Sequence, residues 1–60
     1  MKPVVNLTEH NGNAFSIMAR VRKALIKEGM EKEAEEFINK ARSGDYDNLL
    51  RTTMEYVDVV

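Results

Sequence analysis

Residues 14–30, AFSIMARVRKALIKEGM, decide the fold of this sequence. Apolar residues recur along the stretch at spacings of three and four, the period of one face of an α-helix. They are Ala14, Ile17, Met18, Val21, Ala24 and Leu25, with Phe15 and Ile26 widening the stripe. Gly29 can adopt the left-handed conformation that ends many helices, and Met30 can then pack on Leu25. The stretch predicts a helix over residues 14–28, with Asn13 as its N-cap.

A second amphipathic segment follows this Gly29 turn directly. Acidic residues crowd its beginning and basic residues occupy its end, which is the distribution that the helix dipole favours. Those acidic residues are Glu31, Glu33, Glu35 and Glu36, and the basic ones are Lys40 and Arg42. The apolar positions with helical spacing are Ala34, Phe37, Ile38 and Ala41. We expect a second helix that ends at Ser43 and Gly44.

Asp45 is a good N-cap residue and begins the third segment. Residues 46–56 have helical spacing and predict a third helix. Its apolar face is expected to consist of Tyr46, Leu49, Leu50, Thr53 and Met54, and to continue to Val57.

The two ends of the chain have a different pattern. Residues 3–8, PVVNLT, and residues 57–60, VDVV, are β-branched, which favours extended backbone. Pairing of the tail with residues 4–7 would bury Val5, Leu7, Val57 and Val59 together. The sequence therefore predicts a mostly α fold at the margin of α+β: one domain over residues 1–60, with three short helices joined by glycine turns and a two-stranded clip made from both ends.

The composition limits what such a chain can do. A chain of 60 residues buries only about 60% of the surface that its unfolded form exposes, so its core leaves a thin margin of stability. There is no cysteine for disulfides or thiolate metal sites, and we expect no metal or other cofactor. Self-association is the remaining way to bury more apolar surface, so we expect a homo-oligomer.

Charge and hydropathy set the expected environment. The formal net charge of −1 removes the electrostatic attraction that dominates most nucleic-acid binding, so a nucleic-acid partner is disfavoured. No apolar run is long enough to span a membrane, and the first residues do not resemble a signal peptide. The lack of cysteine fits a reducing compartment. These features favour a cytoplasmic location without a membrane partner.

The residues for catalysis are sparse. His10 is the only histidine, and it lies in the polar turn of residues 9–13 beside Glu9. A general base must be held in place and its pKa tuned, which a lone histidine in a turn does not suggest. The sequence contains no phosphate-binding glycine loop. We therefore expect that this protein is not an enzyme.

Two loops contain the polar residues that the fold does not obviously require. The turn that enters the first helix and the turn at residues 44–48 both lead into helix N-termini, where free N–H groups suit an anion. Aromatic residues nearby could stack on a base, and arginines could pair with a phosphate. The candidate ligand- or partner-binding residues are His10, Asn11, Gly12, Asn13, Phe15, Arg20, Asp45, Tyr46, Asp47, Asn48 and Arg51.

A plainer interpretation competes at both loops. Asn13 and Asp45 can simply cap their helices, and Phe15 can pack in the core, because every helix has such a terminus. Asp45-Tyr46-Asp47-Asn48 also fails the calcium-loop pattern, which requires an oxygen ligand at its fifth position and glycine at its sixth. Convergence of the loops on one concave polar pocket would favour a ligand site, whereas separate caps would favour the plainer interpretation.

Basic residues lie on one face of the first helix. Arg20, Lys23 and Lys27 share this face, and the helix–turn–helix of residues 14–42 superficially suggests a DNA reader. The second helix would enter the major groove, and its glutamates would repel the phosphates. A solvated face, or pairing of the basic first helix with the acidic second helix of another copy, is the better interpretation.

Two short motifs indicate a family. The sequences GNAF at residues 12–15 and SGDYDNLL at residues 43–50, with the ending VDV, resemble a set of small uncharacterised proteins encoded by bacteriophages, prophages and mobile elements. The resemblance covers residues 10–60. It implies a phage-borne accessory protein in a bacterial cytoplasm and implies no role for any residue.

Three functions follow in order of preference. The first is a small non-catalytic interaction protein that binds a host protein partner through an apolar or oligomeric surface. The alternative is a protein that binds or sequesters a nucleotide or cyclic-dinucleotide signal through the two loops. The third is a weak nucleic-acid binder.

Overall fold

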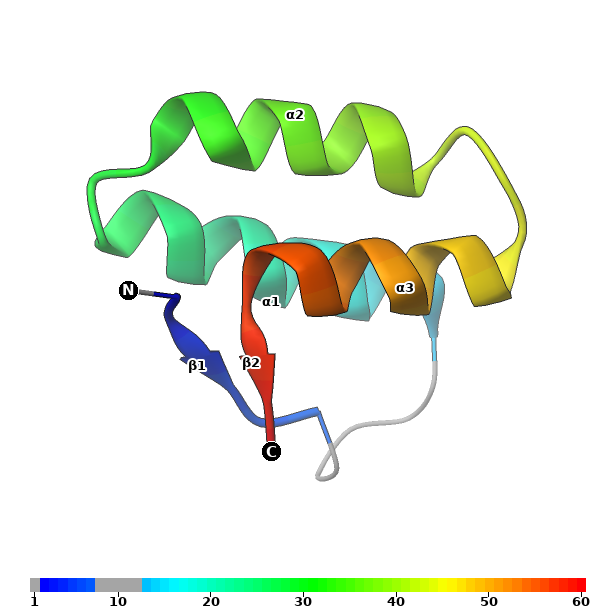
Figure 1. The fold of residues 1–60 in the computed structure, drawn as a ribbon, viewed down its shortest axis with the longest axis horizontal. Helices are drawn as coiled ribbons and strands as arrows, with labels where there is room; N and C mark the ends of the chain where they lie inside the picture. The colour runs from blue at the N-terminus through cyan, green and yellow to red at the C-terminus, as the bar shows by residue number, and fades with distance from the viewer. Residues whose placement is uncertain (1, 8–12) are drawn as a thin grey trace.

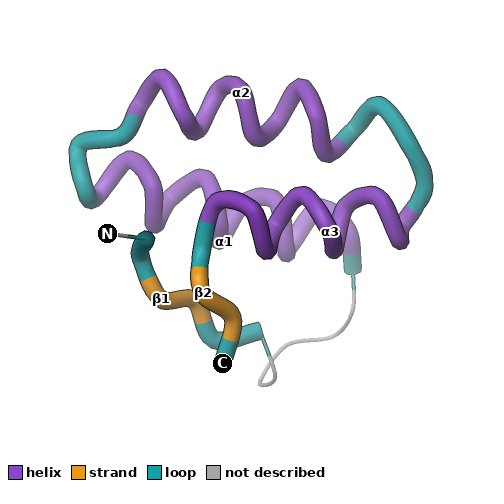
Figure 2. The backbone as a smooth tube through the Cα atoms, in the orientation of Figure 1, coloured by secondary structure: helices purple, strands orange, loops and turns teal. Residues whose placement is uncertain are grey.

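The computed structural model describes residues 2–7 and 13–60. In this part of the chain three helices pack together, and two short strands lie beneath them (Figures 1 and 2). The mostly helical fold with a small sheet confirms the predicted class. The elements are β1 (Val4–Val5), α1 (Ala14–Lys27), α2 (Glu31–Ala41), α3 (Tyr46–Tyr56) and β2 (Asp58–Val59).

Both ends of α1 form as predicted. The Asn13 side chain accepts hydrogen bonds from the backbone N–H groups of Phe15 and Ser16, at 2.9 and 3.3 Å. At the other end the Met30 N–H donates to the Leu25 carbonyl at 2.8 Å, and the Gly29 N–H donates to the Ile26 carbonyl at 2.9 Å. This pair of bonds is the Schellman ending, and Gly29 has the left-handed φ of 77° that it requires.

The core gathers one face of every helix. Phe37 from α2 is completely enclosed, and its ring meets that of Tyr56 edge-on, with the centroids 5.7 Å apart. Such edge-to-face contact is a preferred arrangement of aromatic pairs. The buried apolar residues are Val5, Ile17, Val21, Leu25, Ala34, Phe37, Ala41, Leu49 and Val57.

The inward face of α3 differs from the prediction. Met54 was expected on this face but is 58% exposed, whereas Thr52, which was not expected there, is buried together with the predicted Thr53. Leu49, Thr52, Thr53 and Tyr56 also have helical spacing, and this face is the one turned toward Phe37. The two hydroxyls donate to the carbonyls four residues earlier, at 2.7 and 2.8 Å, which removes the penalty for burying them.

The strands form the expected clip in parallel register, with Val4 opposite Asp58 and Val5 opposite Val59. The N–H of Asp58 donates to the Pro3 carbonyl at 2.9 Å, and the N–H at the last residue donates to the Val5 carbonyl at 3.0 Å.

The predicted burial of the clip residues is only partly right. Val5 and Val57 are buried and Leu7 is partly buried, but Val59 remains 41% exposed. Figure 1 shows β2 running away from the helices toward the C-terminus, which takes Val59 beyond their cover.

Substitutions of Gly29 test whether the α1–α2 turn requires the left-handed backbone conformation of this residue. No atom lies within 4 Å of the place that a Cβ would occupy, so the penalty arises from the left-handed φ alone. We expect Gly29→Ala to lower the free energy of unfolding by about 1 to 2 kcal/mol in urea denaturation. Gly29→Asn should lose less, because asparagine tolerates this conformation better. Equal stability of all three proteins would contradict the Schellman ending.

Candidate functional site

The first turns of α1 and α3 meet at an apolar hollow of about 280 Å³. Phe15 and Tyr46 lie on its border, and both are exposed, at 79% and 44%. We call this hollow the Phe15–Tyr46 pocket. Its lining residues are Ala14, Phe15, Met18, Ala41, Arg42, Gly44, Asp45, Tyr46 and Leu49.

Phe15 is presented outward by its place in α1. Ala14, Ile17 and Met18 direct their side chains toward the core, and Phe15 falls beside that stripe rather than in it. The interpretation that Phe15 packs in the core is therefore wrong. A large aromatic side chain is left in solvent at the beginning of a helix that does not need it for packing.

The turn from α2 to α3 holds Tyr46 in place through a set of side-chain caps. The Asp45 carboxylate accepts a hydrogen bond from the Asn48 N–H at 2.9 Å. The Asn48 side-chain amide reaches back and donates to the Lys40 carbonyl at 2.9 Å, and the Ser43 hydroxyl donates to the same carbonyl at 2.8 Å. One network therefore ends α2 and starts α3.

Gly44 allows this network to close. A Cβ at this position would lie 2.9 Å from the Cβ of Asn48, closer than real side chains approach. Glycine is required here by the contact with Asn48, and its φ is not in the left-handed region.

Three of the described candidate residues border one hollow, and this hollow is apolar. Of the candidate residues, Phe15, Asp45 and Tyr46 line the Phe15–Tyr46 pocket. Asn13 and Asp45 are helix caps, as the plainer interpretation proposed. Asn48, for which no capping role was predicted, donates to the Lys40 carbonyl at the end of α2. The remaining polar candidates lie elsewhere or outside the described residues.

Arg20 lines a different hollow, between β1 and α1. Asp47 and Arg51 are exposed on α3 and line neither hollow. His10, Asn11 and Gly12 lie outside the described residues. The structure thus does not bring Arg20 or Arg51 to the aromatic side chains on which a base would stack.

Several residues that line the Phe15–Tyr46 pocket were not predicted from the sequence as site residues. Met18, Ala41 and Leu49 read only as members of the apolar stripes, because each also contributes to the core or packs against it. Arg42 was interpreted from the sequence only as a basic residue that complements the helix dipole. No periodicity could show that these side chains, from three helices, border one surface hollow.

Three ionisable side chains lie together where α2 packs against the end of α3. The Lys40 ammonium lies 5.4 Å from the centre of the Tyr56 ring, and the Tyr56 hydroxyl lies 3.5 Å from Glu36. The interaction with the Tyr56 side chain raises the pKa of Lys40 above its ordinary value, so Lys40 stays protonated through the neutral range. This cluster therefore offers no base near pH 7 from Lys40.

Residues 2–7 and 13–60 contain neither a cluster of metal ligands nor a helix that could cross a membrane. No group of three His, Asp or Glu side chains in these ranges is arranged to hold a metal ion. None of the three helices there has the length and apolar character needed to cross a bilayer.

Comparisons with protein-family models, with curated proteins and with solved structures found no match to this chain. The resemblance carried by the GNAF and SGDYDNLL motifs therefore stays a prediction. The function has to be argued from the geometry of the surface.

Substitutions at Asp45 distinguish a role in capping α3 from a role in binding a ligand. Asp45→Ala removes the acceptor for the Asn48 N–H and should lower the free energy of unfolding by about 1 kcal/mol. Asp45→Ser supplies another capping oxygen and should restore most of that loss, as measured by urea denaturation. A serine variant as unstable as the alanine variant would show that the carboxylate does more than cap α3.

Proposed function

We propose that this chain is a small, non-catalytic interaction protein that binds a protein partner through the Phe15–Tyr46 pocket. The exposure of Phe15 beside an apolar hollow is the observation that carries the proposal. Tyrosine and other aromatic residues anchor many protein interfaces, because they bury much area with few rotatable bonds. A partner side chain would enter the hollow between Phe15 and Tyr46.

The polar groups around the pocket favour a protein over a nucleotide. The oxygens and amides of Asn13, Asp45 and Asn48 already bond to backbone groups of the helix ends. Arg42 is the only basic residue among the described lining residues, so a polyphosphate would lack partners. This supports the interaction function over a nucleotide or cyclic-dinucleotide site.

Self-association and setting form part of the same proposal. A domain of this size gains stability when a second copy covers exposed apolar surface, and the Phe15–Tyr46 pocket offers such surface. We place the protein in a bacterial cytoplasm as a phage or mobile-element product acting on a host protein. This setting rests on the resemblance of the two loop motifs.

Phe15→Ala tests the proposal with little risk to folding. Because Phe15 is 79% exposed, its removal should change the free energy of unfolding by less than about 0.5 kcal/mol. The variant should nevertheless lose self-association in sedimentation equilibrium and lose capture of a partner from bacterial lysate. Met54→Ala is the matched control, since Met54 is an exposed large apolar residue that does not line the pocket.

Two results would count against the proposal. One is a wild-type chain that is strictly monomeric and captures nothing. The other is a melting temperature that rises with millimolar nucleotide or cyclic dinucleotide, since a ligand that binds only the folded state stabilises it by mass action. That rise would support the nucleotide alternative instead.

A further inference from the structure

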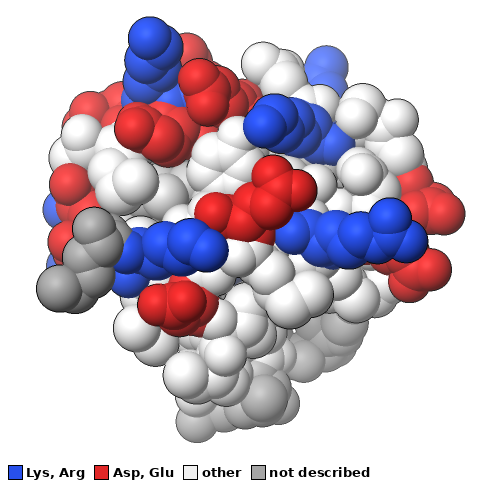
Figure 3. All heavy atoms as spheres, in the orientation of Figure 1, with Lys and Arg blue, Asp and Glu red and all other residues white. Residues whose placement is uncertain are grey.

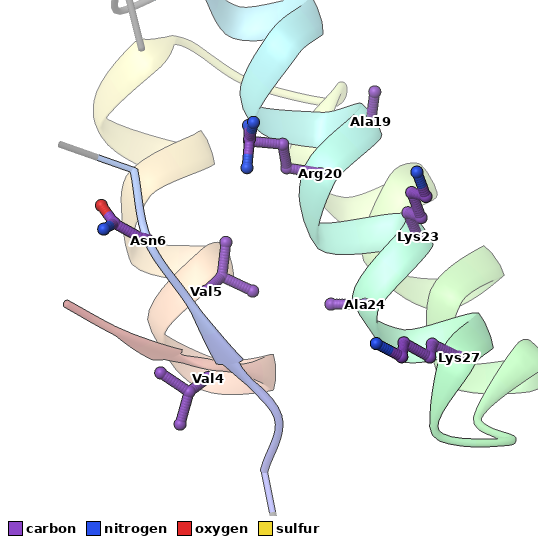
Figure 4. Close-up of a pocket in the computed structure, with 8 residues that line it drawn as sticks. All are labelled: Val4, Val5, Asn6, Ala19, Arg20, Lys23, Ala24 and Lys27. Atoms are coloured by element: carbon purple, nitrogen blue, oxygen red, sulfur yellow. The ribbon is translucent and has the colours of Figure 1, made fainter. Parts of the chain in front are cut away.

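A second hollow, of about 420 Å³, lies between β1 and α1 on another side of the molecule (Figure 4). Residues 4–6 form one wall, and Arg20, Lys23 and Lys27 border the other. Figure 4 shows Val5 pointing from β1 toward α1, and Arg20 and Lys27 extending from α1 toward the strand. We call this hollow the β1–α1 groove.

Among the described residues, the charge in this groove has one sign. Every charged residue of residues 2–7 and 13–60 that lines it is basic, and none of these three cations lies within 4.0 Å of a carboxylate oxygen of the same ranges. By contrast, Figure 3 shows acidic and basic side chains interspersed over the face seen in Figure 1. An anionic group entering the groove would therefore meet cations that have no partner among the described residues.

The β1 wall also offers unused backbone hydrogen-bonding groups. In the sheet of the described residues β1 has one neighbour, β2, which bonds to the carbonyls of Pro3 and Val5. Successive residues of a strand direct their N–H and C=O groups to opposite edges, so those of Val4 point away from β2. Val5 of β1 points toward α1 in Figure 4, so α1 covers one face of β1, and a strand added at the free edge would direct alternate side chains to that same face.

We propose that the β1–α1 groove binds an extended acidic segment of another protein, which pairs with the free edge of β1. Addition of a strand to an exposed edge is a common mode of peptide recognition. From Arg20 to Lys27 the cations span about 10 Å along α1, at about 1.5 Å per residue. Acidic residues at alternate positions of a strand lie about 6.6 Å apart on one face, so two of them fit that span.

Other anions fit the groove less well. No aromatic residue of residues 2–7 and 13–60 lines it, so a nucleotide base would have nothing in these ranges to stack on. A nucleic acid would extend beyond three cations onto a protein whose net charge is −1. Neither ligand would use the strand edge. Phe15 and Tyr46 do not line this groove, so the inference is independent of the proposed function.

The test uses the full chain and a fluorescein-labelled heptapeptide with glutamate as its third and fifth residues and valine or threonine elsewhere. Fluorescence anisotropy at low salt should show saturable binding, and the peptide with both glutamates changed to glutamine should bind about ten-fold more weakly. Lys23→Gln and Lys27→Gln should each weaken binding about three-fold. Arg22→Gln is the matched control, because Arg22 lies on α1 but lines a hollow with Glu35 of α2.

A second pair of variants tests the strand edge. Val4→Pro removes the N–H that points away from β2 and should abolish peptide binding, while Val4→Thr keeps it and should bind normally. A heptapeptide N-methylated at its central residues should also fail to bind, and this result does not depend on the folding of any variant.

The named alternatives would overturn the inference. Equal binding of the glutamine peptide would exclude charge recognition, and normal binding of the N-methylated peptide would exclude pairing with β1. Displacement of the labelled peptide by inorganic phosphate at the same concentration as unlabelled peptide would indicate a simple anion site. Tighter binding of short single-stranded DNA than of the peptide would show that the groove is a nucleic-acid site. Absence of any peptide binding would show that the groove is not a site for an acidic strand.

Discussion

Complete burial of Phe37 is the interaction on which the rest of this small domain depends. The ring belongs to a cluster to which all three helices, β1 and Val57 at the beginning of the tail contribute. Tyr56 packs against it edge-on and brings the end of α3 onto α2. With so few other large side chains inside, removal of this ring would cost several kcal/mol out of a margin that is itself small, about 3 to 5 kcal/mol for cores of this size. The three helices and β1 all contribute buried residues to the cluster around it.

The small size of the domain also explains why the described polar residues of the loops act as helix caps. A domain of 60 residues has many helix ends relative to its core, and each end leaves backbone groups that need partners. Asn13, Asp45 and Asn48 supply these partners, and Asn48 bonds at once to the end of α2 and the start of α3. Polar side chains that look available in the sequence are thus needed by the fold. The aromatic side chains beside them, Phe15 and Tyr46, stay exposed, and the proposed partner binding rests on this exposure.

α1 separates two surfaces of different chemistry. Phe15 and Arg20 are five residues apart, which places them about 140° apart around the helix axis. Phe15 therefore borders the apolar pocket beside the α2–α3 turn, while Arg20 borders the basic β1–α1 groove. An interaction protein built this way can hold one partner by an aromatic anchor and another segment by charge and backbone pairing, with no overlap between the two sites.

Local chemistry in the sequence was enough to predict the three helices, their caps at Asn13 and Asp45, the Schellman ending at Gly29 and the pairing of the two chain ends. The helices and their ends depend on periodicity, on capping oxygens and on a single glycine conformation, all of which act between residues close in the chain. The pairing of the two ends joins residues far apart in the chain and was predicted from their β-branched composition. The choice of Thr52 over Met54 for the core, the exposure of Val59 and the outward position of Phe15 were decided only by how the elements pack. Helical spacing defines a stripe but not how far the helix rotates about its axis, and that rotation depends on the shape of Phe37 and its neighbours. For the same reason both surface hollows appear only when side chains from separate elements meet in three dimensions.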